Sequence, residues 1–402
     1  MARLAGSARL LRAINSSATL AHLLQHGRLT RADLRELTGL SKPTSSEMLR
    51  LLTDAGLAMV AGRTSGGLGP TAEIYAPNPE AGYAAAVSVR DPTGDSPGDG
   101  RGSGRPSLAA AVCDLAGALR SRVESDVDFA STQPADAVVE ILHDAGRRAG
   151  ITADRIRQVQ IAVAGSYDPR SETIRHVDVP GWDRPGLIGE IRRQLQAAVA
   201  IDNDVNLAAV AERDRGVASA ADGFALVWLD HGIGLAIDLG GTLLRGARGS
   251  AGEIGYLPLP APNGGHDLQD LVGGPAVVAL ARQHGLRAQT APEAVAGAVA
   301  ADPTGPAAQF LTELAARIAY VLGAVVAVLD PPLVVLAGAV AQAGGIRLRE
   351  AVATATRAVV PLEAEIAVTA VTDDAVLFGA LDAGLAALRE SLITSLAQPN
   401  PA

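Results

Sequence analysis

The sequence predicts an α/β protein that begins with a winged helix-turn-helix, a small unit of three helices and a β-hairpin. A helix, a glycine turn and a second helix fill residues 29–55, and a glycine-rich hairpin follows them. From Ala84 onward, short β-branched runs alternate with helices rich in alanine and leucine, which is the pattern of an α/β domain. Because 402 residues exceed one ordinary core, we predict two parts, 1–79 and 80–402.

The first predicted helix runs from about Ser7 to His26. Its apolar positions recur at helical spacing, namely Leu11, Ile14, Leu20, Leu23 and Leu24. The second helix runs from Arg31 to about Thr38, with Leu34 and Leu37 on one face.

The third predicted helix follows Gly39, which adopts a positive φ without steric cost and so suits the turn. Ser41 caps this helix through its hydroxyl group, and Pro43 lies in the first turn, where its missing N–H costs little. The residues predicted to be buried are Met48, Leu51 and Leu52.

The opening turn of the third helix is expected to expose one cation and several short hydrogen-bond donors, which suit phosphates and base edges in a DNA major groove. We therefore predict a DNA-contacting surface here. The residues assigned to it are Arg31, Lys42, Thr44, Ser45, Ser46, Arg50 and Arg63.

The hairpin is predicted from a strand at Leu57–Val60 and a returning strand at Ile74–Tyr75. Its glycine-rich tip holds Arg63, which would contact a phosphate or enter a minor groove. The alternative is a solvated hairpin tip. Residues 1–80 carry a charge of +3, with nine Lys and Arg against six Asp and Glu, and the remainder carries −12. This balance fits a DNA-binding head on an acidic body, although +3 over eighty residues also fits chance.

The composition excludes several other classes of protein. Hydrophobic residues make up 48% of the chain and charged residues 19%, which is typical of packed globular domains. The most apolar stretch, residues 318–329, falls short of the roughly 18–20 residues that span a bilayer and is expected to be a buried helix. We therefore predict a cytoplasmic protein with no membrane contact. The single cysteine, Cys113, excludes an internal disulfide and a multi-cysteine zinc site.

The α/β part is predicted to start after a linker marked by Pro77 and Pro79. Helices are expected at 134–149 and 185–196. The segment at about 91–106 is rich in Gly, Pro, Ser and Asp and is expected to be a mobile loop. The predicted strands lie at 84–89, 107–115, 159–165, 198–204, 223–229 and 234–238.

Five segments in this part resemble the ROK family of repressors, open reading frames and kinases. They begin with QIAVAGSYDPR, IDNDVNLAAVAE and GARGSAGEIGY, and continue with VVLAGAVAQAGG and TDDAVLFGAL. The resemblance implies a sugar-kinase fold of the actin-like type, with two α/β lobes around a cleft. The repressor branch of this family adds an N-terminal winged helix-turn-helix.

The resemblance assigns the position of the family's catalytic base to Asp204, in the Asp202-Asn203-Asp204 sequence, where Asp202 replaces the usual glutamate. Asn203 and Asp204 would then hydrogen-bond the hydroxyl groups of a sugar. The alternative is that both residues only cap the helix at Val205–Arg213.

The phosphate loop of a kinase is where this chain departs from the family. The D-x-G-G-T turn belongs near Val87–Val89, but the sequence continues with Arg90 at that place. A matching string at Asp238–Thr242 lies where the family has an ordinary hairpin, and Gly240-Gly241 suits the turn of a hairpin. We therefore predict that this string is not a phosphate loop.

The metal site and the sugar pocket are also altered. The cysteines of the family's zinc cluster are missing here, and Tyr256 occupies the position of the zinc-binding histidine. His266 alone is expected to be a loop residue. We therefore predict no bound metal. Glu253 matches a sugar-contacting glutamate, whereas Gln269 and Asp178 replace a glutamate and an asparagine. These polar groups favour an altered ligand, and the alternative is a pocket that binds nothing.

Taken with the resemblance, these departures predict a repressor of carbohydrate-related genes that is not an enzyme and needs no cofactor. Asp204 would be a vestigial base, and a sugar or sugar derivative would be the effector. The expected DNA partner is a palindromic double-stranded operator, bound by a homodimer or homotetramer. Two alternatives stay open: a sugar kinase with an accessory DNA-binding domain, and a regulator without a sugar ligand.

Overall fold

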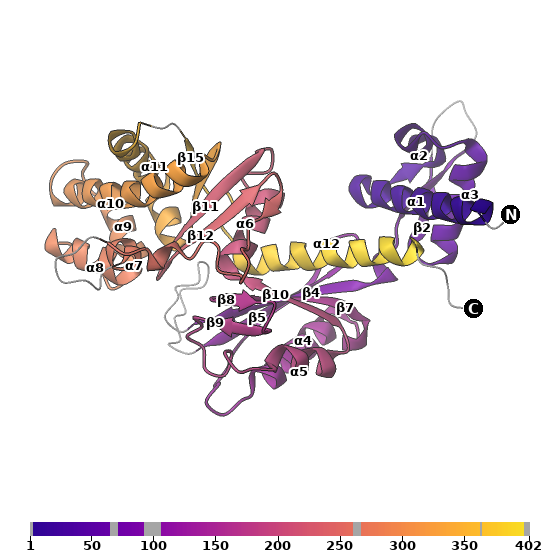
Figure 1. The fold of residues 1–402 in the computed structure, drawn as a ribbon, viewed down its shortest axis with the longest axis horizontal. Helices are drawn as coiled ribbons and strands as arrows, with labels where there is room; N and C mark the ends of the chain where they lie inside the picture. The colour runs from indigo at the N-terminus through magenta and orange to yellow at the C-terminus, as the bar shows by residue number, and fades with distance from the viewer. Residues whose placement is uncertain (1–2, 65–70, 92–105, 260–266, 362–363, 398–402) are drawn as a thin grey trace.

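The structure is a computed structural model that describes residues 3–64, 71–91, 106–259, 267–361 and 364–397. Its elements form a head at one end of the molecule and a body of two lobes (Figure 1). The segments 65–70, 92–105 and 260–266 lie outside the described residues, and with them lie the wing tip, nearly all of the expected mobile loop and His266.

The described residues of the head form three helices and a three-stranded antiparallel sheet with the strand order β1-β3-β2. Thr30 and Asp33 cap the second helix reciprocally, and Gly39 ends it with a φ of 69°. The Ser41 hydroxyl accepts a hydrogen bond from the backbone N–H of Thr44, so the predicted cap of the third helix is confirmed. The bounds are α1 Arg3–His26, α2 Arg31–Thr38, α3 Lys42–Asp54, β1 Leu29–Thr30, β2 Ala58–Arg63 and β3 Glu73–Pro77.

The core of the head differs from the prediction at three positions. Leu51 is half-buried and Leu49 is buried in its place, because α3 turns one face inward through Ser45, Met48, Leu49 and Leu52. The predicted core residues Leu11 and Ile14 are 59% and 54% exposed. They lie outside because the buried face of α1 is formed by Ala13, Ser16, Leu20 and Leu23.

The first lobe is built on a five-stranded sheet with the order β10-β7-β4-β5-β6. β4 pairs with β5 and β5 with β6 in antiparallel fashion, whereas β4, β7 and β10 are parallel. The helices α4 (Pro134–Ala149) and α5 (Leu187–Leu195) share the apolar core of this lobe with the sheet. The strands are β4 Tyr83–Arg90, β5 Ser107–Asp114, β6 Leu119–Asp126, β7 Ile156–Val163 and β10 Ala198–Asn203; a small hairpin, β8 Ser166–Asp168 and β9 Thr173–Arg175, follows β7.

The second lobe repeats the same strand topology with the order β13-β12-β11-β14-β15. Its first two neighbouring pairs are antiparallel and its last two strands are parallel to β11. The strands are β11 Gly223–Leu229, β12 Ile233–Leu239, β13 Thr242–Leu243, β14 Leu333–Ala337 and β15 Glu365–Val368, and the helices are α7 Leu268–Val272, α8 Gly274–Gln283, α9 Ala291–Ala300, α10 Pro306–Leu329 and α11 Ala339–Val359. This duplication is the two-lobed organisation that the resemblance implies.

One described helix, α10, is long and apolar enough to cross a membrane. Inside the protein, 56% of its most apolar window is buried. Phe310, Leu314, Ile318 and Leu322 of this helix lie in the largest apolar core, together with strands of the second lobe. The helix therefore packs as a core helix, which confirms the prediction for residues 318–329.

Two helices connect the lobes. α6 (Asp204–Arg215) follows the last strand of the first lobe and packs against the second sheet, and α12 (Ala375–Ala397) follows the last strand of the second lobe and packs against the first sheet. The far half of α12 then reaches the head, where Leu388 and Leu392 share an apolar cluster with Leu20 of α1 (Figure 1). The C-terminal helix thus contacts all three parts of the protein.

Candidate functional site

A cleft of about 460 Å³ lies between the two lobes. All six residues predicted to bind a ligand line it, although they come from distant parts of the sequence. They are Asp178, Asn203, Asp204, Glu253, Tyr256 and Gln269. This convergence follows from the duplicated topology, because the ends of corresponding strands face each other across the gap between the lobes.

Asn203 and Asp204 lie at the N-terminus of α6, and both take part in capping it. The Asn203 carbonyl oxygen accepts hydrogen bonds from the backbone N–H groups of Val205 and Asn206, at 2.9 and 3.2 Å. Its amide nitrogen donates to the Gly165 carbonyl at 3.3 Å, and Asp204 Oδ1 accepts from Val205 N at 2.8 Å. Capping therefore occupies part of each side chain, and both residues still line the cleft.

Burial raises the pKa of Asp204 to about 7 from its ordinary value of 3.8. The negative charges of Glu253 and Asp230 raise it further, and the Val205 N–H opposes the shift. A carboxyl group with such a pKa is half protonated near neutral pH, so it can either donate or accept a hydrogen bond there.

This shift predicts that Asp204→Asn stabilises the protein at alkaline pH. The native state holds a proton that the unfolded state releases between pH 3.8 and about 7, so native stability falls across that window. Above about pH 7, the charged carboxylate lowers the free energy of unfolding by at most about 4 kcal/mol, because each pH unit of the pKa shift corresponds to about 1.4 kcal/mol. The amide of the variant carries no charge and avoids this loss. In thermal melts, the variant should have a higher melting temperature than the wild type at pH 8 and the same melting temperature at pH 4. Exposed Asp183→Asn is the control, and an equal gain at both pH values would contradict the assignment.

Glu253 and Tyr256 form the wall of the cleft on the second lobe. Glu253 accepts a hydrogen bond of 2.5 Å from the hydroxyl of buried Ser166. The Tyr256 ring is 58% exposed and lies 5.1 Å from the His176 ring, between centroids. Burial and the nearby carboxylates of Glu253 and Asp178 raise the pKa of Tyr256, so its hydroxyl remains a hydrogen-bond donor.

Gln269 lines the cleft, and its amide also binds backbone groups of the second lobe. Its Oε1 accepts from the backbone N–H of Ile233 at 3.0 Å, and its Nε2 donates to the His231 carbonyl at 3.3 Å. Both ends of the amide therefore hold the turn between β11 and β12, where Asp230 and His231 line the cleft. The sequence motif predicts that Gln269 lies in the pocket. The hydrogen bonds between its amide and the backbone are seen only in the structure.

Sequence reasoning gave no role to Asp202, which turns out to be buried beneath the cleft. Its Oδ1 accepts from the Asn206 amide at 3.0 Å, and its Oδ2 accepts from Arg245 Nε at 2.8 Å. Asp202 thereby ties α6 to the loop after β13. Because Asp202 lies in strand β10 and Asn206 lies in α6, this contact depends on how the helix follows the strand and not on a helical spacing in the sequence.

Near the place where the resemblance puts the phosphate loop, Arg90 forms a partly buried cluster of ion pairs. Arg90 is 13% exposed and pairs with Glu124 and with Asp374, and Asp374 also pairs with Arg122. Arg90 lines the cleft at the end of β4. At the end of β4 the cleft is thus lined by a guanidinium group with two carboxylate partners.

The matching string at Asp238–Thr242 is a hairpin, as predicted. β12 and β13 pair in antiparallel register, and Gly240 and Gly241 form the turn with φ values of 64° and 83°. The Asp238 carboxylate accepts from Gly241 N at 2.8 Å. Asp238 and Gly240 line a second hollow of about 320 Å³ rather than the cleft.

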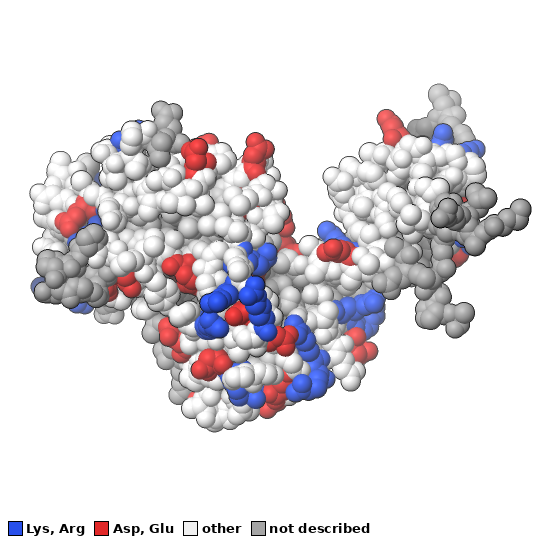
Figure 2. Space-filling model, viewed as in Figure 1, with Lys and Arg blue, Asp and Glu red and all other residues white. Residues whose placement is uncertain are grey.

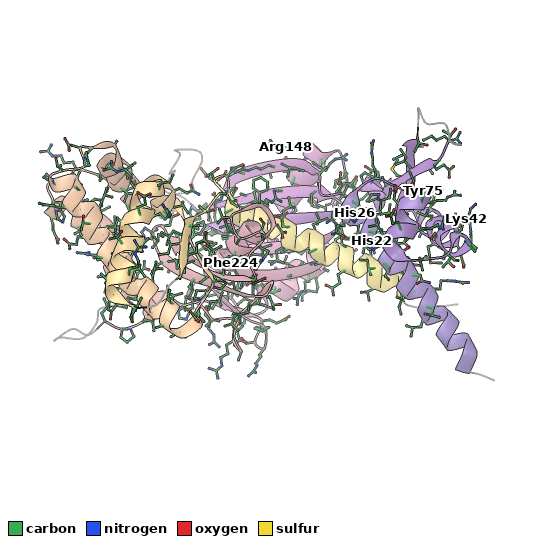
Figure 3. The ribbon with its side chains drawn as sticks, turned by 90° about the horizontal axis from the view of Figure 1, so that it is seen from above. His22, His26, Lys42, Tyr75, Arg148 and Phe224 are labelled. Carbon is green, nitrogen blue, oxygen red and sulfur yellow. The ribbon has the colours of Figure 1, made fainter. Side chains whose placement is uncertain are left out.

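On the head, Lys42 is exposed at the first residue of α3, on the far side of the head from the body (Figure 3). Thr44 and Ser46 are half-buried, and the Thr44 hydroxyl lies 2.8 Å from that of Ser41. The prediction for Ser45 is wrong, because this residue is only 2% exposed and faces the core with Met48 and Leu52. Its hydroxyl has no hydrogen-bond partner among the described residues.

The three predicted DNA-contacting arginines are placed differently from one another. Arg31 pairs with Glu73 at 2.7 Å and donates to the Tyr75 hydroxyl from Nε at 3.2 Å and from Nη2 at 2.5 Å, so it joins α2 to the hairpin. Arg50 pairs with Asp54 one turn further along α3. Arg63 is exposed at the last residue of β2, opposite Glu73, rather than in the tip itself.

The distribution of charge does not single out the head. On the face drawn in Figure 2, the Lys and Arg side chains gather over the first lobe, among Asp and Glu, and the head is largely uncharged. The basic excess of the N-terminal residues is therefore not a continuous patch on this face. The position of Lys42 at the start of α3 is the stronger indication of where a polyanion would bind.

The duplicated lobes and the cleft between them define a protein of the actin-like sugar-kinase class. The sequence model described as the ROK family matches residues 102–386, which is more than half of the chain. The protein therefore belongs to the ROK family, as the sequence motifs indicated.

Relatives with known names include both enzymes and regulators. The bifunctional enzyme NanE/NanK of Brucella suis is 33% identical over 51% of this chain and 40% of its own length. The xylose repressor of Bacillus subtilis is 24% identical over 61% of this chain and 60% of its own length. The chain thus spans about half the length of these curated relatives.

Two solved structures show the same fold. A ROK hexokinase from Thermus thermophilus matches with a TM-score of 0.62 and 25% identity, over 77% of this chain and 99% of its own. A ROK family transcriptional regulator, described as a homolog of the E. coli MLC protein, matches with a TM-score of 0.71 and 18% identity. That match covers 96% of this chain and 99% of the regulator, so the likeness in fold includes the head.

Proposed function

We propose that this protein is a DNA-binding transcriptional regulator of carbohydrate-related genes, and that its ROK body senses a sugar or sugar derivative without phosphorylating it. The observation that carries the proposal is the combination of two features in one chain. The head has the helices and hairpin of a winged helix-turn-helix, and Arg90 with its carboxylate partners occupies the position of the phosphate loop. The first feature supports DNA binding, and the second argues against kinase activity.

In this proposal, residues 1–79 are the DNA-binding domain and residues 80–402 the ROK domain. The N-terminal turn of α3 enters the major groove with Lys42, and Arg63 of β2 contacts the backbone beside it. The body forms the homodimer or homotetramer, so that two heads contact half-sites of a palindromic operator about 34–36 Å apart. A ligand that closes the cleft changes the distance between the heads and releases the DNA, which is the action of a repressor.

The cleft is expected to bind a neutral or amino sugar through Asn203, Asp204 and Glu253. The Asn203 amide donates one of its two hydrogens to Gly165, Asp204 accepts from Val205 through one oxygen, and Glu253 accepts from Ser166 through one oxygen. All three residues line the cleft. A sugar at 100 times its dissociation constant should stabilise the protein by about 2.7 kcal/mol. A thermal-shift panel of monosaccharides and amino sugars should find such a ligand, and Asn203→Ala should abolish the shift.

The matched control for this prediction is Asn206→Ala, which removes an amide of the same helix turn that faces Asp202 rather than the cleft. It should lower the melting temperature but leave the ligand-induced shift in place. A panel in which no sugar shifts the wild type would reject the sensing role and favour a regulator without a sugar ligand.

A sugar kinase with an accessory DNA-binding domain is the alternative, and Asp204 favours it because its raised pKa suits a general base. A coupled ADP-release assay over the same sugars distinguishes the two functions. We expect no turnover above background. Turnover that Asp204→Asn abolishes would overturn the proposed function.

A further inference from the structure

We propose that helix α12 mechanically links the cleft to the head, and that a latch formed by Arg90, Arg122 and Asp374 fixes its cleft end. This inference rests on the proposed function, because it concerns how an event in the cleft would change the head. Figure 1 shows α12 running from the junction of the two lobes to the head. The helix is continuous over 23 residues.

The cleft end of α12 lies where the chain passes from the second lobe to the first. Asp374, Ala375 and Val376 line the cleft. Asp374 is 8% exposed and accepts hydrogen bonds from Arg90 Nη2 of β4 at 2.5 Å and from Arg122 Nη2 of β6 at 2.8 Å. Five residues earlier, the backbone N–H of Thr369 still donates to the Leu336 carbonyl of β14 in the second lobe. A movement of one lobe against the other must therefore pass through the residues beside the latch.

The first turns of α12 are also fixed to α6. The Phe378 ring has the Arg122 guanidinium at 5.7 Å and the Arg215 guanidinium at 5.2 Å from its centroid. Arg215 pairs in turn with Asp382 of α12. The cleft end of α12 thus has charged partners on both the first sheet and α6. When these two elements move relative to each other, this end of the helix is expected to move with them.

The other end of α12 lies against α1 of the head. Leu388 and Leu392 are buried in one cluster with Leu20 and Leu23, and the Ser17 hydroxyl donates to the Ile393 carbonyl at 3.4 Å. In the view of Figure 3, α12 meets α1 close to the labelled His22 and His26. The contact is mainly apolar, and its partner α1 packs directly on the proposed DNA-contacting helix.

Helix α1 contacts the proposed DNA-contacting helix α3 directly. On α1, the Ser16 hydroxyl donates to the Arg12 carbonyl at 2.9 Å and lies 3.3 Å from the sulfur of Met48, and the Arg12 side chain pairs with Glu47 at 3.0 Å. Met48 and Glu47 belong to α3. The 19 residues of α12 from Ala375 to Ile393 span about 28 Å, so a tilt of about 5° at the latch displaces the head end by about 2 Å. A displacement of this size is enough to move α1 and α3 together relative to the body.

The first test compares Asp374→Asn with Asp373→Asn in the full-length protein. Asp373 is the adjacent carboxylate, pairs with Arg122, and is 64% exposed, so its variant is a matched control. Amide hydrogen exchange followed by mass spectrometry should show several-fold faster exchange in α1 for Asp374→Asn only. Faster exchange confined to residues around the latch, with α1 unchanged, would overturn the link. Arg90→Lys, which keeps the charge but alters the pair, replaces Asp374→Asn if that variant does not fold.

The second test uses a double-mutant cycle with Leu392→Ala at the head end. Effects of sites so far apart ordinarily add on a free-energy scale. The link predicts instead that Asp374→Asn changes the affinity for upstream DNA in the wild type, and that this change disappears in the Leu392→Ala background. Additive effects would contradict the link. Wild-type protein that binds no DNA would count against the proposed function, and the exchange experiment would still decide on the link.

Discussion

Replacing Lys42 by alanine is expected to weaken binding to the operator by about 5- to 150-fold, which corresponds to the ~1–3 kcal/mol of one good base or phosphate contact. Lys42 begins α3, is exposed, and lies where the positive end of the helix dipole adds to its own charge. Arg63→Ala should weaken binding as well, and should reduce the salt dependence of binding by about one charge because it removes a phosphate contact. Fluorescence anisotropy at several salt concentrations measures both effects.

The control for this prediction lies on the same helix. Ser45 is buried with no hydrogen-bond partner among the described residues, so Ser45→Ala removes a buried hydroxyl group and touches no DNA-facing surface. It should leave operator binding unchanged and should not lower the melting temperature. If Ser45→Ala weakened DNA binding as much as Lys42→Ala, the proposed orientation of α3 would be wrong.

Replacing Gly379 by alanine is expected to destabilise the protein by about 3 kcal/mol or more. Gly379 lies in α12 where it crosses α6, and an added Cβ atom would stand 1.7 Å from the Leu207 carbonyl oxygen and 3.0 Å from Ala211 N. These are backbone atoms of a helix, so no side-chain rotation relieves the clash. Alanine in a helix interior normally gains about 0.5–1 kcal/mol over glycine, so the predicted sign is the reverse of the usual one.

The matched variant for this prediction is Gly297→Ala in α9. Gly297 is also inside a helix, but an added Cβ atom would meet nothing within 4 Å. Chemical denaturation should show a small gain for Gly297→Ala and a large loss for Gly379→Ala. Two gains of similar size would mean that α12 and α6 are not packed as closely as described.

Much of the fold follows from local patterns in the sequence. The cap at Ser41, the turn at Gly39 and the hairpin at Gly240-Gly241 were predicted because turn and cap chemistry depends on a few neighbouring residues. The burial of Ser45 was also within reach, since positions 45, 48, 49 and 52 share one face of a helix. Helical phase, and not side-chain polarity, decides that Ser45 lies on the buried face of α3.

Other features depend on contacts that local patterns do not contain. The motif positions placed Gln269 in the pocket, but its hydrogen bonds to Ile233 and His231 follow from the packing of α7 beside a distant turn. The contact of α12 with α1 joins residues more than 350 positions apart and leaves only an ordinary apolar periodicity in each helix. The sequence alone therefore suggested two separate parts, whereas the structure connects them through the last helix.

The most direct test of the central claim is fluorescence anisotropy on double-stranded DNA from the protein's own upstream region, titrated with a panel of sugars, amino sugars and sugar phosphates. The proposed function predicts salt-dependent binding to this DNA, little binding to a scrambled sequence of the same length, and release by at least one compound. Equal binding to both sequences, or no binding at all, would contradict the claim that this ROK protein is a transcriptional regulator.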